Sequence, residues 1–437
     1  MPVEQRPRPS RELRDFLLDL LPRTHAAIVH PATDKNAPPP HHPRPSKAPE
    51  VSHPGERIHL VADVLTQRAL NRATLARQLL LTREPRPILD TIEHLIGLQA
   101  QAPQPPYYGL WSRIDGFTPD QLSTLITNRD AVRIALMRGT IHLVSARDCL
   151  QLRPLFQTSL DRWLTTAFGR QLPGVDLDAV TTHGRTLVET TPLTFDELGK
   201  QLAPHWPDAT PQALAQVIRG RVPLVQVPPR GLWGAAGAAR HTSAETWLGQ
   251  PLDPAPSIDQ LVLRYLNAFG PATVKDIQTW SGLTRLREVT TRLAPHLRAF
   301  RGEDGAELYD LPEAPRPDPD TPAPCRLVAE FDNLVLSHAD RTRVMTDADR
   351  KRFFTVNGIF PGVLLLDGRC AGTWRITRER EAITLAFTPY RKLTAAEIDD
   401  VTAEGHRLLD FATSAPAPEA ATAASPPFRQ LRFEALR

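Results

Sequence analysis

The sequence predicts an α+β fold in which helical segments end in pairs of short strands and a strand-rich segment follows. Capping boxes and apolar residues at helical spacing recur between residues 65 and 293, with short alternating segments between them. After a proline-rich stretch at 313–324, the apolar residues follow strand-like patterns. A chain of 437 residues with 41% hydrophobic residues is long enough for several domains, each with its own core.

Composition excludes several classes of protein. The net charge is only +3, from 52 basic and 49 acidic residues, so a nucleic-acid surface must come from local clusters. Cys149, Cys325 and Cys370 form no CxxC pair, which argues against a disulfide framework or a thiolate zinc site and fits a reducing cytoplasm. No apolar run is long enough for a membrane span. Because no metal, P-loop or dinucleotide motif is present, we expect neither a metal nor a cofactor.

Two segments at the start of the chain differ sharply. Residues 1–57 are rich in proline and poor in large apolar residues, which predicts a disordered extension. Residues 64–172 are predicted to form the first folded unit. Its expected elements are helices over 67–81, 87–97 and 118–127, a strand over 140–144, and a further helix that begins at Ser145.

Two further units have the order helix, helix, hairpin, which is typical of a winged helix. In the unit at 184–250, strands at 224–227 and 231–233 are expected to flank a hairpin tip that carries Arg230. The unit at 255–312 repeats this order, with helices over 257–269, 273–280 and 284–293 and strands at 297–300 and 308–311.

The C-terminal part changes to a strand-like pattern. Residues 313–324 are predicted to be a linker and residues 325–412 a small β-barrel. Asp367-Gly368 is a strong signal for a two-residue hairpin turn. Residues 414–437 are expected to be a flexible tail.

A polar triplet, Gln99-Ala100-Gln101, follows the second predicted helix. Gly97 is a natural end for that helix, and the prolines at 103, 105 and 106 are expected to prevent a new one. In an extended segment Gln99 and Gln101 point to the same side, with Ala100 turned away. The ordinary interpretation of this pattern is a polar loop with two solvated glutamines.

Several stretches of the chain resemble the AlkZ-like winged-helix DNA glycosylases, a family named for an enzyme that unhooks azinomycin-type interstrand crosslinks. The resemblance covers residues 64–412. One departure is Ala329, which stands where a proline is common. The stretches that carry the resemblance are residues 97–103 (GLQAQAP), 137–144 (MRGTIHLV), 223–234 (PLVQVPPRGLWG), 331–333 (FDN), 337–341 (SHADR), 367–368 (DG) and 372–374 (GTW).

The resemblance implies a fold and a catalytic pair. The fold would be three tandem winged helices followed by a C-terminal β-barrel, in a C-shaped monomer with a concave DNA-binding surface. The family's catalytic signature, glutamine–any residue–glutamine or aspartate, falls on Gln99 and Gln101. With glutamine as the second residue of the signature, the chain resembles the crosslink-type branch of the family.

Two amides are unusual catalytic groups, because a glutamine is no general base in water. Glycosidic hydrolysis normally uses two carboxylates. An N7-alkylated purine is already cationic and leaves without protonation, so a placed water and an oriented dipole suffice. Lysines are distant from the triplet in sequence, which argues against a Schiff base and for an intact abasic product. Asp90 and Glu93 are alternative bases, although solvated helix positions explain both.

Further residues are candidates for DNA contacts. Some of these residues also have a structural interpretation. His142 can be a histidine of the core, and the group at 332–341 can be a polar turn. Tyr107, Tyr108 and Trp111 are either core or a platform for stacked bases. The candidate DNA-binding residues are Arg138, His142, Arg230, Asp332, His338 and Arg341.

The sequence therefore predicts a monofunctional DNA glycosylase for N7-alkylated purines, including bulky adducts or interstrand crosslinks. Its partner would be double-stranded DNA that carries such purines, and we expect a monomer in the cytoplasm, associated with the nucleoid when bound to DNA. The alternative is a non-catalytic winged-helix DNA-binding protein, either a transcription regulator or a resistance protein that sequesters lesions.

Overall fold

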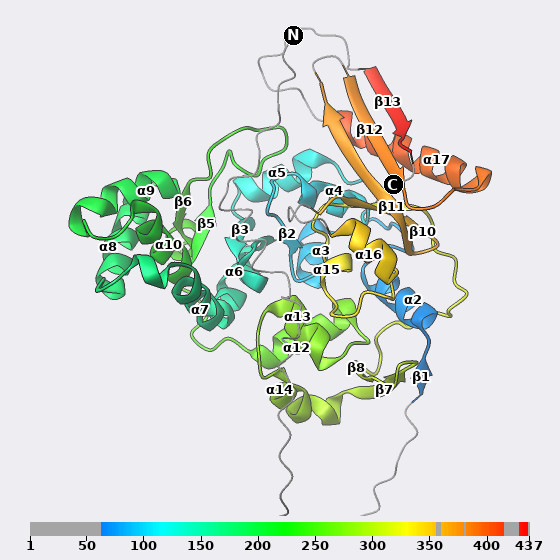
Figure 1. Ribbon diagram of the computed structural model, residues 1–437, viewed down its shortest axis with the longest axis horizontal. Helices are drawn as coiled ribbons and strands as arrows, with labels where there is room; N and C mark the ends of the chain where they lie inside the picture. The colour runs from blue at the N-terminus through cyan, green and yellow to red at the C-terminus, as the bar shows by residue number, and fades with distance from the viewer. Residues whose placement is uncertain (1–62, 355–359, 380–381, 415–427, 436–437) are drawn as a thin grey trace, which may run out of the picture. The chain divides into compact units, whose positions relative to one another are not determined.

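The computed structural model describes residues 63–354, 360–379, 382–414 and 428–435 (Figure 1). The predicted extension at 1–57 lies outside the described residues, as does most of the predicted tail. The described strands form three sheets, with the orders β1-β7-β8, β2-β4-β3-β5-β6 and β13-β12-β11-β10-β9.

The first helices follow their capping signals closely. Thr66 accepts a hydrogen bond from Ala69 and begins α2 (Gln67–Arg77), and the capping box of Thr118 and Gln121 begins α5 (Pro119–Thr127). The helix α3 (Ile88–His94) ends before Gly97, as the glycine indicated.

One expectation for this region is wrong, because Pro105 and Pro106 do not prevent a helix. They open α4 (Pro105–Trp111), where they occupy the first two helical positions. Backbone N–H groups in the first turn have no partner within the helix, so a proline there loses no hydrogen bond. The consequence is that the Gln99 segment has helices on both sides.

The sheet that carries Gln99 joins two of the predicted units. Antiparallel pairing joins β2 to β4, β4 to β3 and β3 to β5, so strands on both sides of residue 172 share one sheet. At its far edge, β5 pairs with β6. The strands are β2 (Leu98–Gln99), β3 (Ala131–Ala135), β4 (Ile141–Ser145), β5 (Leu224–Gln226) and β6 (His241–Ser243).

The hairpin expected at 224–233 is therefore wrong in its second strand. The partner of β5 is β6, and residues 227–240 form a long connection that carries Arg230. Pro228 and Pro229 have no N–H group to continue a strand ladder, and Gly231 has a φ of +101°, outside the strand range. The segment at 231–233 consequently forms turns.

Between β4 and β5 the chain is helical. Its main helices pack around buried aliphatic residues such as Val180, Leu198 and Leu214, and they gather beside β5 and β6 in Figure 1. The helices from β4 to the end of this region are α6 (Ala146–Leu152), α7 (Gln157–Phe168), α8 (Leu177–Thr190), α9 (Phe195–Leu202), α10 (Pro211–Arg221) and, after β6, α11 (Ala244–Leu248).

The next region has the element order expected for residues 255–312. Three helices, α12 (Ile258–Phe269), α13 (Val274–Ser281) and α14 (Leu286–Leu293), precede the antiparallel pair β7 (Arg298–Gly302) and β8 (Glu307–Asp310). The short β1 (Val64–Leu65) adds a parallel strand to β7 from the start of the described chain. The assignment of three winged helices stays a prediction.

The C-terminal sheet is open, so the predicted β-barrel is wrong. Among the described strands, β9 and β13 are the two edges and do not pair with each other. The long helix α17 (Ala395–Thr413) contacts β9, β12 and β13, so a helix covers this sheet instead of closure into a barrel. The strands are β9 (Arg326–Val328), β10 (Gly362–Leu366), β11 (Arg369–Arg378), β12 (Ala382–Pro389) and β13 (Phe428–Phe433).

Two details of this sheet test the sequence predictions. The turn at Asp367-Gly368 joins β10 to β11, and both residues have positive φ, which confirms the hairpin signal. The tail prediction is wrong at 428–433, where β13 pairs in parallel with β12. Phe433 lies against Phe387, with ring centroids 5.4 Å apart, and this contact fixes the edge strand.

One hydrophobic core spans the first helices and the C-terminal sheet. Trp111 of α4 packs against Phe411 of α17, with centroids 5.9 Å apart, and Tyr108 packs edge-on against Trp374 of β11. This core brings residues 95–113 beside residues 329–333. The short helices α15 (Asn333–Leu336) and α16 (Asp347–Phe353) lie in the connection between β9 and β10.

Candidate active site

Gln99 lies on β2, a two-residue strand at the edge of its sheet, and its residue exposure is only 4%. Gly97 fixes the approach of this strand. Its φ is +87°, and a Cβ atom at this position would lie 2.6 Å from Val144 Cγ1 and 2.9 Å from the Leu143 carbonyl oxygen. Only glycine fits this conformation and this close contact. The strand therefore holds Gln99 opposite His142 of β4.

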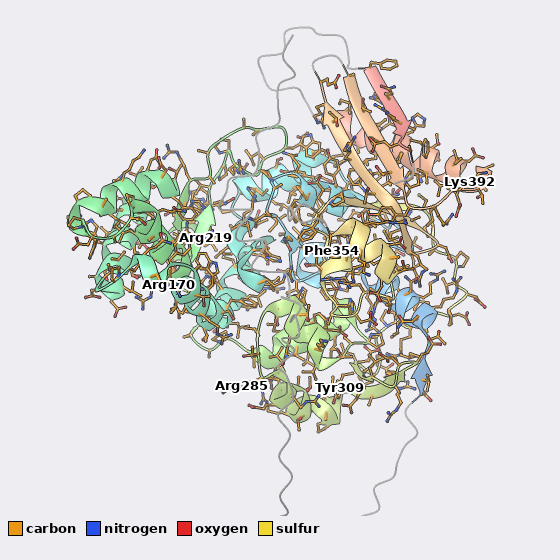
Figure 2. The ribbon with its side chains drawn as sticks, viewed as in Figure 1. Arg170, Arg219, Arg285, Tyr309, Phe354 and Lys392 are labelled. Carbon is orange, nitrogen blue, oxygen red and sulfur yellow. The ribbon has the colours of Figure 1, made fainter. Side chains whose placement is uncertain are left out.

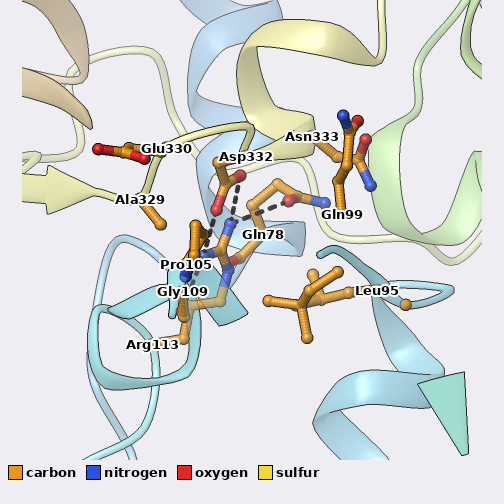
Figure 3. Close-up of a pocket in the computed structure, with 12 residues that line it drawn as sticks. Gln78, Leu95, Gln99, Pro105, Gly109, Arg113, Ala329, Glu330, Asp332 and Asn333 are labelled. Carbon is orange, nitrogen blue, oxygen red and sulfur yellow. Dashed lines mark hydrogen bonds and ion pairs between the residues drawn. The ribbon is translucent and has the colours of Figure 1, made fainter. Parts of the chain in front are cut away.

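The Gln99 amide is held by a buried arginine. Arg138 Nη2 donates to Gln99 Oε1 at 2.8 Å and to Asn333 Oδ1 at 3.2 Å, while Nη1 donates to the Trp280 carbonyl oxygen. Because a guanidinium only donates, the oxygens of both amides must face Arg138. Figure 3 shows the amides of Gln99 and Asn333 side by side.

The charge of Arg138 has no acid beside it. Within the described residues, the ion pairs do not include Arg138, and its hydrogen-bond acceptors are two amides and a peptide carbonyl. Burial, and then the nearby charge of Arg341, lower the pKa of Arg138 to about 10, which leaves it protonated at neutral pH. The site therefore contains a buried cation with neutral partners only.

Gln101 is placed differently from Gln99. Its Oε1 accepts a hydrogen bond from the Ile141 N–H at 3.2 Å, and its side chain is half-buried. Between the two glutamines, Ala100 is fully buried, and its carbonyl oxygen accepts a hydrogen bond from Arg133 Nη2 at 2.6 Å. Two bonded amides, one of them buried, differ from the loop of solvated glutamines that the ordinary interpretation describes.

A small pocket opens next to Gln99 (Figure 3). The pocket is narrow and has room for roughly one water. A nucleobase therefore does not fit into the pocket in this conformation. The polar residues that line it are Gln78, Gln99, Arg113, Glu330, Asp332 and Asn333.

Asp332 has a structural role in this pocket. Its two carboxylate oxygens accept from Arg113 Nη1 and Nη2 at 2.8 and 2.9 Å, and both side chains are buried. One of these oxygens also accepts from the Leu334 N–H at 2.8 Å and caps α15. In this conformation both oxygens of the predicted DNA contact are occupied by the protein.

The two histidines predicted to contact DNA are also buried. His142 is 0% exposed, and burial followed by the nearby Arg138 charge lowers its pKa to about 3, so its ring is neutral. His338 is 1% exposed, and its ring nitrogens lie 3.0 Å from Ser337 Oγ and 3.0 Å from the Phe269 carbonyl oxygen. Neither ring reaches solvent, because the surrounding helices and strands cover both.

Two arginines of the predicted group lie nearer the surface. Arg230 is half-buried in the 227–240 connection and donates to the Gly237 carbonyl oxygen at 3.2 Å. The Arg341 guanidinium lies 4.4 Å from the centre of the Phe354 ring, a residue labelled in Figure 2. Burial lowers the pKa of Arg341 to about 10, and the group stays charged.

The alternative candidates have structural explanations. Glu93 accepts from Ser145 Oγ at 2.7 Å and pairs with Arg147, while Asp90 is exposed. Both line a different pocket from Gln99. Tyr107, Tyr108 and Trp111 belong to the main hydrophobic core, which agrees with the core interpretation of these aromatic residues.

Sequence reasoning missed Asn333 and Arg113 as parts of this site. Asn333 belongs to the Phe331-Asp332-Asn333 stretch, and that stretch was the signal available for it. Arg113 had no distinguishing pattern. Across the described ranges, no group of three or more His, Cys, Asp or Glu side chains is arranged to hold a metal. Among the same residues, every helix is too short or too polar to cross a membrane.

Three comparisons with known proteins identify the family of this chain. The DNA glycosylase AlkZ-like family matches residues 92–411. The interstrand DNA cross-link repair glycosylase of Streptomyces sahachiroi is 23% identical over 360 residues, which cover 74% of this chain and 91% of that protein. The solved structure of the DNA glycosylase AlkZ of Streptomyces sahachiroi has a TM-score of 0.66 at 18% identity and covers 85% of this chain and 100% of that chain. The chain therefore belongs to the DNA glycosylase AlkZ-like family and is a hydrolase that acts on N-glycosyl bonds of DNA.

Proposed function

We propose that this glycosylase is monofunctional and releases cationic N7-alkylated purines, including bulky adducts and interstrand crosslinks, to leave an abasic site. The observation that carries the proposal is the Gln99 amide, which is buried on an edge strand and held by Arg138. A neutral amide in fixed orientation suits a leaving group that already carries its positive charge. The relative from Streptomyces sahachiroi is an interstrand DNA cross-link repair glycosylase, which supports crosslinks as substrates here.

Gln99 and Gln101 are the catalytic pair in this proposal. As the glycosidic bond breaks, positive charge develops on the sugar, and a water must attack C1′. Each glutamine oxygen has one protein donor, so its second lone pair remains for a water, and each amide NH2 is available to the sugar–phosphate. Loss of one such polar contact typically lowers the rate by about 10²–10³.

The size of the pocket supports a substrate whose base stays outside it. Room for roughly one water is too little for a purine that has rotated out of the helix. A crosslinked purine is tied to the opposite strand and does not leave the duplex freely. A water in the pocket and a base that remains in the duplex are compatible with that constraint.

We also propose how the protein holds DNA. Arg230 and Arg341 are charged, lie nearer the surface than the buried candidates, and would contact phosphates. Three winged helices in one chain would let a monomer bind duplex DNA without a partner copy. The order of α12, α13, α14 and the β7–β8 pair supports the winged-helix assignment for residues 255–312. His142, Asp332 and His338 would act on DNA binding only through the residues that they contact.

A base-release assay tests the catalytic part of the proposal. Duplexes with N7-methylguanine and with an N7-linked interstrand crosslink are incubated with the protein, and free base is measured under single-turnover conditions. We expect release by the wild type and a loss of at least about 10² in the Gln99→Ala, Gln101→Ala double variant. Glu330→Gln is the matched control, because Figure 3 places this carboxylate on the side of Asp332 away from Gln99.

Two results would contradict the proposal. Retained activity in the double variant would remove the glutamines from the mechanism, and loss of activity in Glu330→Gln would assign the chemistry to a carboxylate. Tight DNA binding without base release from any alkylated duplex would instead favour the non-catalytic binder as the alternative.

A further inference from the structure

We propose that Asn333 is a further residue of the catalytic site, and that its amide NH2 group binds an oxygen of the sugar–phosphate backbone at the lesion nucleotide. The inference deepens the proposed function and rests on it, because it assigns Gln99 to the glycosidic reaction. It starts from the single guanidinium nitrogen that holds both amides, Arg138 Nη2.

The orientation of both amides follows from Arg138. Its Nη2 lies 2.8 Å from Gln99 Oε1 and 3.2 Å from Asn333 Oδ1, so the two oxygens converge on one donor. The NH2 groups then point away from the guanidinium, and the two amides stand side by side (Figure 3). The two side chains come from two elements, β2 and α15, and both line the small pocket.

The NH2 group of Asn333 has no hydrogen-bond partner among the residues that the structure describes. Asn333 is 6% exposed, and its Nδ2 atom is buried without a hydrogen bond. A buried donor without an acceptor destabilises the folded protein, so such a group calls for an explanation, and a bound ligand is one. An amide NH2 group recognises an oxygen acceptor, and the sugar–phosphate of DNA consists of such acceptors.

The local charge favours an anionic acceptor. The hydrogen-bond partners of Arg138 are all neutral, so a phosphate oxygen near Gln99 and Asn333 would supply the missing negative charge. A deoxyribose oxygen has the same hydrogen-bonding chemistry without the charge. Both sources belong to the lesion nucleotide, and substituted DNA distinguishes them.

The decisive variant is Asn333→Asp. An aspartate keeps the size of the side chain and the acceptor for Arg138, but it lacks the NH2 donor and repels a phosphate. If Asn333 served only to hold Arg138, the variant would match the wild type. We expect its single-turnover rate on N7-methylguanine duplex to fall by about 10²–10³, with an unchanged melting temperature. Asn333→Ala is expected to lose activity as well, and Asn128→Asp, the same change at an exposed asparagine at the end of α5, serves as the control.

Two further measurements complete the test. Binding to a duplex with a stable abasic analogue is expected to weaken in Asn333→Asp, independently of base release. A methylphosphonate next to the lesion removes the phosphate charge, and a phosphate acceptor predicts that Asn333→Ala then differs little from the wild type. A difference between Asn333→Ala and the wild type that persists on the methylphosphonate duplex would assign the acceptor to the sugar.

If wild-type protein releases base and Asn333→Asp has wild-type rate and binding, the inference is overturned. If wild-type protein releases no base, the proposed function fails, and the binding measurement alone decides the role of Asn333.

Discussion

Two buried arginines meet two adjacent residues at this site, and the two pairs differ in charge. Arg113 binds the Asp332 carboxylate with two hydrogen bonds of 2.8 and 2.9 Å, whereas Arg138 binds the Asn333 amide with one of 3.2 Å. The first pair neutralises its charge, and the second leaves the guanidinium charge unbalanced. Both arginines line or approach the same short segment, residues 332–333.

The difference in charge distinguishes a pair with a structural role from a pair that can bind substrate. A bidentate arginine–carboxylate pair fixes both partners and leaves little for a ligand to bind, so Asp332 joins the turn after α4 to the start of α15. An amide pair around one guanidinium fixes orientation but keeps NH2 groups free for substrate. Asp332 therefore has a structural role and Asn333 a proposed role in substrate binding. Four changes of protein or solvent test this distinction.

The largest expected effect is on stability, at the charged pair. Asp332→Ala leaves the buried Arg113 without its carboxylate and removes the cap of α15. Breaking a buried pair costs about 3–5 kcal/mol of unfolding free energy, measured here by urea unfolding. A double Arg113→Met, Asp332→Leu variant removes both charges and should lose less than the two single variants together. If Asp332→Ala loses less than about 1 kcal/mol of unfolding free energy, the charged pair contributes no more to stability than the Arg138 pair.

Arg138 should show the opposite balance, with a modest effect on stability and a large one on activity. Arg138→Met removes a buried cation along with its hydrogen bonds, so we expect a loss of about 1–2 kcal/mol. Misorientation of the Gln99 amide should lower the single-turnover rate by about 10². Arg138→Lys keeps the charge but has no planar fork for two amides, and activity close to wild type in this variant would show that charge alone is required.

Acid should destabilise the protein through its buried histidines. Burial is the first cause of the low pKa of His142, His241 and His338, each about 3 against an ordinary value of 6.5. A folded-state pKa below the unfolded value means that the contribution is complete above about pH 6.5 and is lost as the pH falls toward 3. Each histidine then contributes a slope of about 1.4 kcal/mol per pH unit.

Arg138 links this pH dependence to the comparison of the two arginines. Its charge is the second cause of the low pKa of His142, so Arg138→Met should raise that pKa and end the loss of stability at a higher pH. Urea unfolding between pH 3 and 7 measures the pH profile, and His142→Asn serves as a reference because it removes one titrating group. If the low-pH end of the profile is the same in Arg138→Met and the wild type, the Arg138 charge does not act on His142.

The smallest expected effect is on the salt dependence of DNA binding. If Arg230 and Arg341 contact phosphates, each alanine variant should reduce the slope of log affinity against log salt concentration by about 0.9. Binding to undamaged duplex at several salt concentrations measures it. Arg113→Met offers a comparison with a buried arginine, for which we expect the wild-type slope. Unchanged slopes for Arg230→Ala and Arg341→Ala would show that other residues contact the phosphates.

Local signals predicted much of the fold correctly. The capping box at Thr118 and the turn at Asp367-Gly368 place a helix and a hairpin where the structure has them, because their geometry depends on neighbouring residues alone. The same signals could not reveal that β3 pairs with β5 across residue 172. Long-range pairing of this kind depends on the packing of the whole chain and leaves no local pattern.

The wrong expectations have specific physical reasons. Pro105 and Pro106 were treated as helix breakers, although the first helical positions accept proline. The open C-terminal sheet is covered by α17, and the strand pattern alone does not distinguish a covered sheet from a closed barrel. In the site, the spacing of Gln99 and Gln101 was visible, while the arginine that orients one of them lies on another segment.

The structure of the Gln99-Ala100-Gln101 triplet bears on how this enzyme would be redesigned. Ala100 is fully buried, with its carbonyl bound by Arg133, and Gln99 is bound by Arg138, so neither position tolerates a new side chain easily. Gln101 is half-buried and receives one backbone hydrogen bond. Because Gln101 is also one of the two proposed catalytic residues, a substitution there alters the chemistry directly while it leaves the edge strand and its two arginine contacts intact.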